Sequence, residues 1–353
     1  MNPVLKVRDV CLSYHTLSGE TPALSHISFD LMPGEFLSIV GPSGCGKSTL
    51  LNLIAGLLTP EHGSITLGDR PVSSGSAAVG YMLQKDHLLE WRSIYKNILL
   101  GLEIRKELTP EKLAHAEALL QTYGLDRFRD ARPSQLSGGM RQRAALIRTL
   151  VLEPELLLLD EPFSALDGYL KDVLQKDMQE FLKQYQGDML MVTHSRDEAF
   201  RFCNELMLLK DGKTLIFGDT RKLFEQPQLL EAARLTGCKN SSRIERMGEY
   251  QVFALDWGIS LRTEQKVELD MTHIAIRGHW IRPSEKAGEN CLVFEAAEYV
   301  ETTFEHQYLV KSPGMEDGAV LWWMRPKKSF TDEHDKNLPK YLYLPPEHLM
   351  LLK

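Results

Sequence analysis

The sequence is poor in cysteine, and its cysteines form no recognisable pattern. Five cysteines are scattered over 353 residues, and no two of them are spaced as C-x-x-C. Disulfide-stabilised extracellular proteins carry an even, closely spaced set, and structural zinc sites need paired ligands. The cysteine usage therefore supports neither a disulfide framework nor a zinc site.

Long hydrophobic runs are absent too. A membrane-spanning helix needs about 20 mainly apolar residues, and every window of about 18 residues in this sequence contains a charge. The segment Met1–Asp9 is charged and strand-like, unlike the apolar core of a secretory signal. We therefore expect the chain to stay in the cytoplasm, with any membrane span supplied by another chain.

An excess of basic residues is the third absence. The sequence has 41 Lys and Arg against 48 Asp and Glu, which gives a net charge of −7. Neither residues 1–239 nor residues 240–353 show the basic excess that is typical of a nucleic-acid-binding surface. We therefore expect no nucleic acid among the partners.

A glycine-rich segment is the strongest positive feature. Gly41-Pro42-Ser43-Gly44-Cys45-Gly46-Lys47-Ser48 fits the pattern G-x-x-x-x-G-K-[ST]. The apolar run Phe36–Val40 before it predicts a buried strand, and Thr49–Gly56 after it predicts a helix that ends at glycine. In this context backbone N–H groups wrap the β- and γ-phosphates of a nucleotide, and the lysine reaches the same oxygens. The predicted nucleotide-binding residues are Gly41, Ser43, Gly44, Cys45, Gly46, Lys47, Ser48 and Thr49.

A run of four leucines is followed by two acids. Leu156–Leu159 predicts a central strand that is covered on both faces, and Asp160 and Glu161 follow it. Open α/β sheets bind ligands at the carboxyl ends of their strands. We expect Asp160 to hold Mg²⁺ through water, and Glu161 to orient or deprotonate an attacking water. The alternative is a purely structural acid that caps the end of the strand.

A second glycine-rich turn, Leu136-Ser137-Gly138-Gly139-Met140, precedes a predicted helix. Such a turn offers further N–H groups to a phosphate. Together with the first loop it resembles the ATP-binding cassette (ABC) family, in which two copies of the chain clamp ATP between them. The resemblance covers about residues 3–235. It implies an ATPase that uses ATP and Mg²⁺ and works as a homodimer.

The resemblance also assigns roles to individual residues. It implies that Tyr14 stacks on adenine, and that Gln84 and His194, each at the end of an apolar strand, take part in hydrolysis with Glu161. It places Asp167 in a loop that crosses the dimer interface. The residues implied to arrange Mg²⁺ are Ser48, Gln84 and Asp160. Those implied to cap the γ-phosphate of the opposite chain are Ser137, Gly138 and Gly139.

The expected fold is α/β, with two domains. Residues 1–238 are predicted to form a P-loop ABC ATPase core with an antiparallel β subdomain and a helical subdomain at about 86–155. Arg141 and Arg143 in that subdomain are expected to be solvated charges. Residues 239–353 carry short apolar runs and turn pairs, which predict a β-rich accessory or regulatory domain. There Trp322 and Trp323 are candidates either for a ligand or regulator site or for the core.

The transported substrate is less constrained. The run Gln84–Ser93 is similar to the nitrate/sulfonate/taurine branch of importers, although Glu90 replaces a proline. A pyrimidine precursor is an equal alternative. The resemblance implies a membrane permease, an extracytoplasmic solute-binding protein and a location at the cytoplasmic face of the membrane. The alternatives are a soluble ABC ATPase acting on nucleic acid or ribosomes, a regulatory ligand sensor, and an exporter ATPase.

Overall fold

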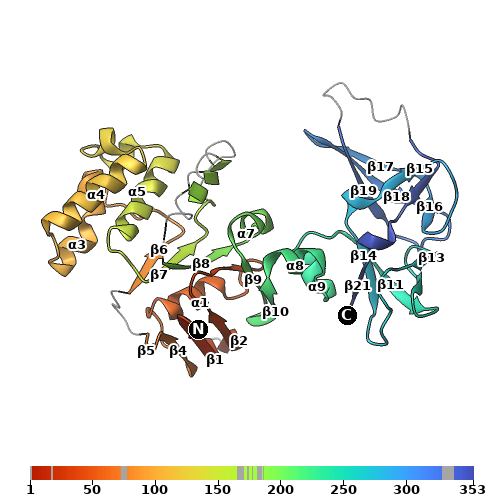
Figure 1. Ribbon diagram of the computed structural model, residues 1–353, viewed down its shortest axis with the longest axis horizontal. Coiled ribbons are helices and arrows are strands. Elements are labelled where there is room, and N and C mark those ends of the chain that lie inside the picture. Colours follow the sequence, from red (N-terminus) through yellow and green to blue (C-terminus); the bar gives the residue numbers. More distant parts are fainter. Residues whose placement is uncertain are drawn as a thin grey trace. The chain divides into compact units, whose positions relative to one another are not determined.

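The computed structural model (Figure 1) describes residues 2–16, 19–72, 78–164, 171–172, 175–176, 178–180, 185, 187–327 and 338–353. The chain divides by its internal contacts into two compact units, Met1–Thr220 and Arg221–Lys353. This division, at 220/221, falls before the expected boundary at 238/239. The boundary at 238/239 stays a prediction.

A six-stranded sheet forms the centre of the first unit. Its order is β10-β9-β3-β8-β7-β6, and β3 pairs in parallel with β8 and β9, as β7 does with β6 and β8. The strands are β3 Phe36–Val40, β6 Val79–Met82, β7 Leu156–Asp160, β8 Asp188–Thr193, β9 Glu205–Lys210 and β10 Lys213–Asp219. Every residue of β3 and β7 is buried, as expected for parallel strands covered on both faces. The carboxyl ends of β3, β7 and β8 therefore meet at one edge.

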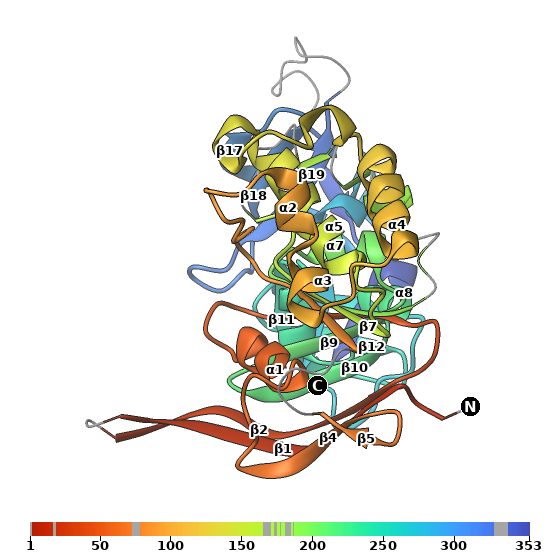
Figure 2. The ribbon, with the colours of Figure 1, turned by 90° about the vertical axis from the view of Figure 1, so that its left-hand side faces the viewer.

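An antiparallel sheet lies on one side of this unit. Its order is β2-β1-β4-β5, with β1 Leu5–Thr16, β2 Gly19–Leu31, β4 His62–Leu67 and β5 Arg70–Pro71. Helix α1 (Lys47–Ile54) lies next to it in Figure 2. Leu50 and Ile54 of α1 share one hydrophobic core with strands of both sheets. The helix that begins at Lys47 is thus packed between the two sheets.

Helices lie on the other side of the six-stranded sheet. They are α2 Ile94–Ile98, α3 Leu100–Arg105, α4 Pro110–Thr122, α5 Gly138–Leu150 and α7 Arg196–Phe202. Of these, α5 and α7 contact strands of the sheet, and α2, α3 and α4 pack with α5 or with one another. A second core joins residues of α2, α4 and α5 to Leu157 and Leu159 of β7. Thr109 caps α4 and Ser137 caps α5 with their side chains, as N-cap hydroxyls commonly do. The expected combination of an antiparallel and a helical part in the ATPase core is confirmed.

The second unit is rich in β-strands, as expected. After α8 (Thr220–Glu225) and α9 (Leu230–Leu235), its sheets have the orders β13-β12-β11-β14-β21, β15-β20-β16 and β17-β18-β19. Its strands are β11 Asn240–Arg246, β12 Gln251–Ala254, β13 Ile259–Arg262, β14 His273–Ile276, β15 Arg282–Ser284, β16 Cys291–Val293, β17 Glu295–Glu301, β18 Glu305–Lys311, β19 Leu321–Pro326, β20 Tyr341–Tyr343 and β21 Met350–Leu352.

The two adjacent tryptophans of β19 have different environments. Trp323 is 1% exposed, and its indole N–H donates to the Ile281 carbonyl at 3.2 Å. Trp322 is half-buried, and the Lys239 ammonium lies 3.8 Å from the centre of its ring. Trp323 is therefore part of the core, which was one of the two roles expected for this pair.

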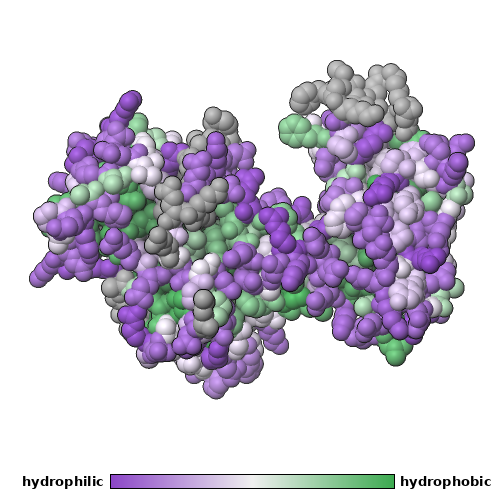
Figure 3. All heavy atoms as spheres, viewed as in Figure 1, coloured by the Kyte–Doolittle hydropathy of each residue, from purple (hydrophilic) through white to green (hydrophobic). Residues whose placement is uncertain are grey.

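The face of the molecule drawn in Figure 3 is mostly hydrophilic. Single apolar side chains are nevertheless exposed, such as Trp91, at 72%, and Ile104, at 73%. Among the helices that the structure describes, none is both long and apolar enough to cross a membrane.

Candidate active site

The glycine-rich loop connects β3 to α1, as predicted. A side chain at Gly41 would place its Cβ 2.1 Å from the Leu209 carbonyl oxygen, so the backbone of β9 leaves room for glycine alone. Gly46 has a φ of +103°, and a Cβ there would lie 2.5 Å from the Ala23 carbonyl oxygen. Both glycines are required by the geometry of the loop.

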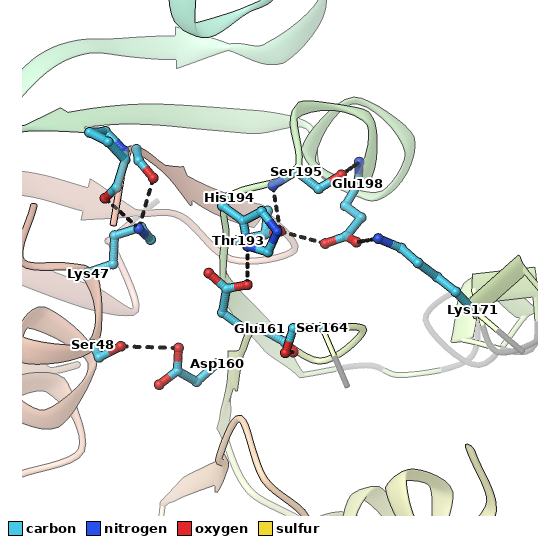
Figure 4. A network of polar contacts seen from close by, with 12 residues as sticks. Lys47, Ser48, Asp160, Glu161, Ser164, Lys171, Thr193, His194, Ser195 and Glu198 are labelled. Atoms are coloured by element: carbon cyan, nitrogen blue, oxygen red, sulfur yellow. Dashed lines mark hydrogen bonds and ion pairs between the residues drawn. The ribbon is translucent and has the colours of Figure 1, made fainter. Parts of the chain in front are cut away.

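Lys47 points back into the loop. It is 8% exposed, and its ammonium donates to the Gly41 carbonyl at 2.8 Å and the Pro42 carbonyl at 2.9 Å (Figure 4). The first turn of a helix also presents unpaired N–H groups and a partial positive charge. The loop therefore concentrates positive charge and N–H donors where it meets α1.

Tyr14 borders a hollow beside the glycine-rich loop. The hollow has a volume of about 320 Å³ and is lined by Tyr14, Thr21, Pro22, Ala23, Gly44, Gly46, Lys47, Ser48 and Thr49. The Tyr14 ring is 45% exposed, and its hydroxyl lies 3.1 Å from that of Thr49. The structure thus brings together the loop and the aromatic side chain that was expected beside adenine.

Asp160 lies at the carboxyl end of β7 and is 6% exposed. It accepts hydrogen bonds from the Ser48 hydroxyl at 3.4 Å and from the Tyr81 hydroxyl at 3.3 Å. Burial raises the pKa of the Asp160 carboxyl, and these hydrogen bonds oppose the shift. Tyr81, which also donates to the Asn52 side chain at 3.2 Å, was not predicted.

Glu161 and His194 lie side by side at the ends of neighbouring strands. β7 and β8 are parallel, with Asp160 in register with Val192, so the residues that follow them meet. The His194 Nδ1 is hydrogen-bonded to the Glu161 carboxylate (Figure 4). Glu161 has a φ of +49°, and its N–H donates to the Val192 carbonyl at 2.9 Å, which fixes its backbone. The two predicted catalytic residues are therefore in direct contact.

Gln84 follows β6, the strand next to β7, and its side chain is exposed. The backbone carbonyl of Gln84 accepts a hydrogen bond from the Gln142 side-chain amide at 3.4 Å. The Gln142 amide also donates to the Pro162 carbonyl at 3.3 Å. Gln142 is 3% exposed and was missed by the sequence analysis. The one sequence signal for Gln142 was its polar side chain among the apolar positions of α5.

The second glycine-rich turn begins α5. The Ser137 hydroxyl accepts from the Met140 N–H at 3.3 Å, Ser137 is exposed, and Gly139 is buried. In Figures 1 and 2, α5 lies with α3 and α4, apart from α1. A hollow of about 370 Å³ at Gly138 is lined by Lys85, Asp86, His87, Gly138, Arg141 and Gln142, none of which lines the hollow at the phosphate loop.

Arg141 and Arg143 of α5 are both paired with acceptors of other segments. Arg141 lies 3.1 Å from the Asp86 carboxylate and donates to the Leu136 carbonyl at 3.0 Å. Arg143 donates to the Tyr123 carbonyl at 3.4 Å. The expectation that both are solvated charges is wrong, because the loop after β6 and the end of α4 supply acceptors that depend on the tertiary fold.

The segment after β7 contains two further residues of interest, Ser164 and Asp167. Asp167, expected in a loop that crosses a dimer interface, lies outside the described residues. The nearby Ser164 donates from its hydroxyl to the Glu161 carbonyl at 3.0 Å. The loop that follows β7 is thereby tied to the residue proposed as the base.

Comparison with known proteins identifies relatives that match up to about two thirds of the chain. The ABC transporter family matches residues 24–164. The ABC transporter ATP-binding protein YtlC of Bacillus subtilis is 43% identical over 228 residues, which are 65% of this chain and 86% of the relative. The Fe(3+) ions import ATP-binding protein FbpC 2 of Haemophilus influenzae is 37% identical, covering 67% of each chain. The taurine import ATP-binding protein TauB of Yersinia pestis is 41% identical, covering 54% of this chain and 75% of the relative.

A solved structure supports the same conclusion. The ATP-binding cassette MJ0796, in a dimeric post-hydrolysis state bound to ADP and Pi, matches with a TM-score of 0.55 and 28% identity. The match covers 62% of this chain and 99% of that one. The expected similarity to taurine importer ATPases is confirmed by the match to TauB. The chain therefore belongs to the ATP-binding proteins of ABC transporters, and it is an ATPase.

Proposed function

We propose that this protein hydrolyses ATP to energise the import of a small solute through a separate membrane permease. The contact between Glu161 and His194, at the sheet edge that also carries the phosphate loop, is the observation that carries the hydrolytic role. The names of FbpC 2 and TauB favour import over export. These two relatives transport different solutes, so nitrate-, sulfonate- or taurine-like compounds and pyrimidine precursors remain candidates.

Nucleotide binding follows from the loop. Tyr14 would stack on the adenine, and the Lys47 ammonium would exchange its backbone carbonyl partners for phosphate oxygens. The Ser48 hydroxyl and the Asp160 carboxylate lie 3.4 Å apart, and such oxygen donors suit Mg²⁺. Ser48 and Asp160 would hold the ion with Gln84, and a bound Mg²⁺ would neutralise charge on the phosphates.

Hydrolysis needs a base and a stabilised transition state. The Glu161 carboxylate would accept a proton from the attacking water, and the His194 imidazole would orient Glu161 and stabilise charge on the γ-phosphoryl group. Phosphoryl transfer is promoted mainly by positioning and electrostatics. The shared edge of β7 and β8 supplies that positioning.

Two copies of the chain would form the complete site. Within one chain, Gly138 of the turn and the phosphate loop line separate hollows. We propose that Ser137, Gly138 and Gly139 of a second copy cap the γ-phosphate, with Asp167 at the same interface. The dimeric state of MJ0796 with ADP and Pi supports dimer formation by this chain.

Glu161→Gln tests the hydrolytic assignment. Loss of a general base lowers kcat by roughly 10²–10⁴-fold, whereas ATP affinity should be retained and dimers should accumulate with ATP. Steady-state phosphate release, nucleotide titration and light scattering measure these three quantities. Glu285→Gln, at an exposed position of the second unit, is the matched control and should hydrolyse ATP normally. Hydrolysis by Glu161→Gln at the wild-type rate would show that the base is assigned wrongly.

The import role needs a separate experiment. The tagged chain is purified from detergent-solubilised membranes of its source cells, and its partners are identified by mass spectrometry. A stoichiometric membrane permease is expected, with a solute-binding protein in the same complex, which would locate this chain at the cytoplasmic face of the membrane. Recovery with ribosomes or DNA alone would overturn the transport role while leaving the ATPase assignment intact.

A further inference from the structure

A buried carboxylate lies shortly after the strand end that carries His194. Glu198, in the first turn of α7, is 4% exposed. One of its oxygens accepts from the Thr193 hydroxyl at 2.5 Å, and the other lies 2.6 Å from the Lys171 ammonium (Figure 4). Buried carboxylates are tolerated when they are paired and hydrogen-bonded, and here both oxygens have partners.

Glu198 contacts the residues on both sides of His194, Thr193 through its carboxylate and Ser195 through its backbone N–H. Thr193, which is fully buried, donates to Glu198 and accepts from the Ser195 N–H at 3.0 Å. The Ser195 hydroxyl in turn accepts from the Glu198 N–H at 3.4 Å and caps α7. Residues 193 and 195 are thus both held by contacts that lead to Glu198.

The position of this backbone decides where the His194 ring lies. The His194 side chain is 60% exposed, so packing restricts it little, while Glu161 is only 14% exposed. A displacement of about 1 Å in a catalytic group can lower a rate roughly 10²-fold. A small shift at Thr193 or Ser195 would therefore move the imidazole away from Glu161.

We propose that Glu198 is a positioning residue for ATP hydrolysis, which fixes the backbone at Thr193 and Ser195 so that the His194 imidazole faces Glu161. Lys171 supplies the counter-charge that holds the buried carboxylate in place. This inference rests on the proposed function, because it requires that Glu161 and His194 serve hydrolysis.

Glu198→Ala removes both contacts of the carboxylate. We expect kcat for ATP to fall roughly tenfold, in keeping with a misplaced catalytic group, with ATP affinity changed by less than about twofold. Glu198→Gln can still accept from Thr193 and should recover part of the lost kcat. Asp197→Ala is the matched control, since the neighbouring Asp197 side chain is 88% exposed, and its kcat should equal that of the wild type.

A second comparison separates positioning from general stability. In a His194→Ala background there is no imidazole to position, so Glu198→Ala should change the remaining rate by less than about twofold. A merely structural role would lower the rate equally in both backgrounds, and that result would overturn the proposal. Hydrolysis by Glu198→Ala at the wild-type rate would overturn it too.

The proposal stays testable if Glu198→Ala does not fold. Lys171→Met should then lower kcat, and Lys171→Arg, which keeps the charge, should restore it; equal rates for the two variants would overturn the proposal. Glu161→Gln is measured in parallel. Loss of hydrolysis in Glu161→Gln with normal hydrolysis in the Glu198 and Lys171 variants would refute the positioning role alone. Normal hydrolysis in Glu161→Gln would instead refute the proposed base.

Discussion

At the scale of single residues, Asp160 illustrates a conflict between stability and the proposed function. The carboxylate is almost fully buried at the end of β7, and its hydrogen-bond donors, Ser48 and Tyr81, are neutral hydroxyls. Burial without a full counter-charge destabilises an ionised group. A position that is unfavourable for an isolated carboxylate is favourable for binding a cation.

We expect Asp160→Asn to stabilise the folded protein at pH 7 in the absence of Mg²⁺ and nucleotide. Burial raises the pKa of Asp160 in the folded state, so protonation of this group favours folding. That contribution is fully present below the unfolded pKa, about 3.9, and is lost as the pH rises through the folded pKa. The neutral amide avoids the loss, and single stabilising substitutions commonly contribute about 0.5–2 kcal/mol.

Urea denaturation of the wild type and of Asp160→Asn measures this effect. The difference in unfolding free energy should be largest near pH 7 and should shrink as the pH falls through the raised pKa of the folded-state Asp160 carboxyl. Asp69→Asn, whose side chain is 93% exposed in the wild type, should show little change. A less stable Asp160→Asn would mean that the hydrogen bonds from Ser48 and Tyr81 outweigh the burial.

At the scale of elements, α5 links two loops of the candidate site. Its Gln142 side chain donates to the carbonyls of Gln84 and Pro162, and Arg148 donates to those of Asp86 at 2.6 Å and His87 at 2.8 Å. A helix that also begins with the Ser137–Gly139 turn is thereby connected to both the loop after β6 and the loop after β7. Movement of α5 would therefore displace both loops or break these hydrogen bonds.

Gln142→Leu tests this connection. Leucine has a similar size but cannot donate, so two carbonyls lose a shared donor, at a cost of about 1–3 kcal/mol in unfolding free energy. We expect kcat to fall and ATP affinity to stay the same, because the phosphate loop belongs to other elements. Steady-state kinetics and urea denaturation measure the two effects. Gln121→Leu, at an exposed position of α4, is the control; an equal response in both variants would contradict the proposed link.

The sequence predicted those elements whose signals are local. The apolar strands Phe36–Val40 and Leu156–Leu159 and the glycine-rich loop are defined by neighbouring residues, and the polar residues after parallel strands meet at one edge. Gln142 lacks such a signal. Its partners Gln84 and Pro162 lie in the loops after other strands, so only the folded chain reveals that this polar side chain is buried and paired.

At the scale of the whole molecule, the N-terminal limit of the second unit depends on helix α9. Helix α9 precedes the expected boundary at 238/239, yet Leu230 and Ala233 pack with Ala275, Met350 and Leu352. The Leu230 N–H also donates to the Lys353 carbonyl at 3.1 Å. These contacts make α9 part of the core of the β-rich unit rather than a linker before it.

We therefore expect a fragment of residues 221–353 to be more stable than one of residues 239–353. The shorter fragment loses the packing of the partly buried Leu230, and full burial of one large apolar side chain contributes roughly 1.5–3 kcal/mol, so the loss should lie below that range. It also leaves the Arg277 guanidinium without the Phe224 carbonyl at 2.6 Å and the Thr236 carbonyl at 2.7 Å. Thermal denaturation followed by circular dichroism compares the two fragments, and equal midpoints would favour the boundary at 238/239. A lower midpoint for the shorter fragment would mean that α9 must be kept whenever the β-rich unit is studied alone.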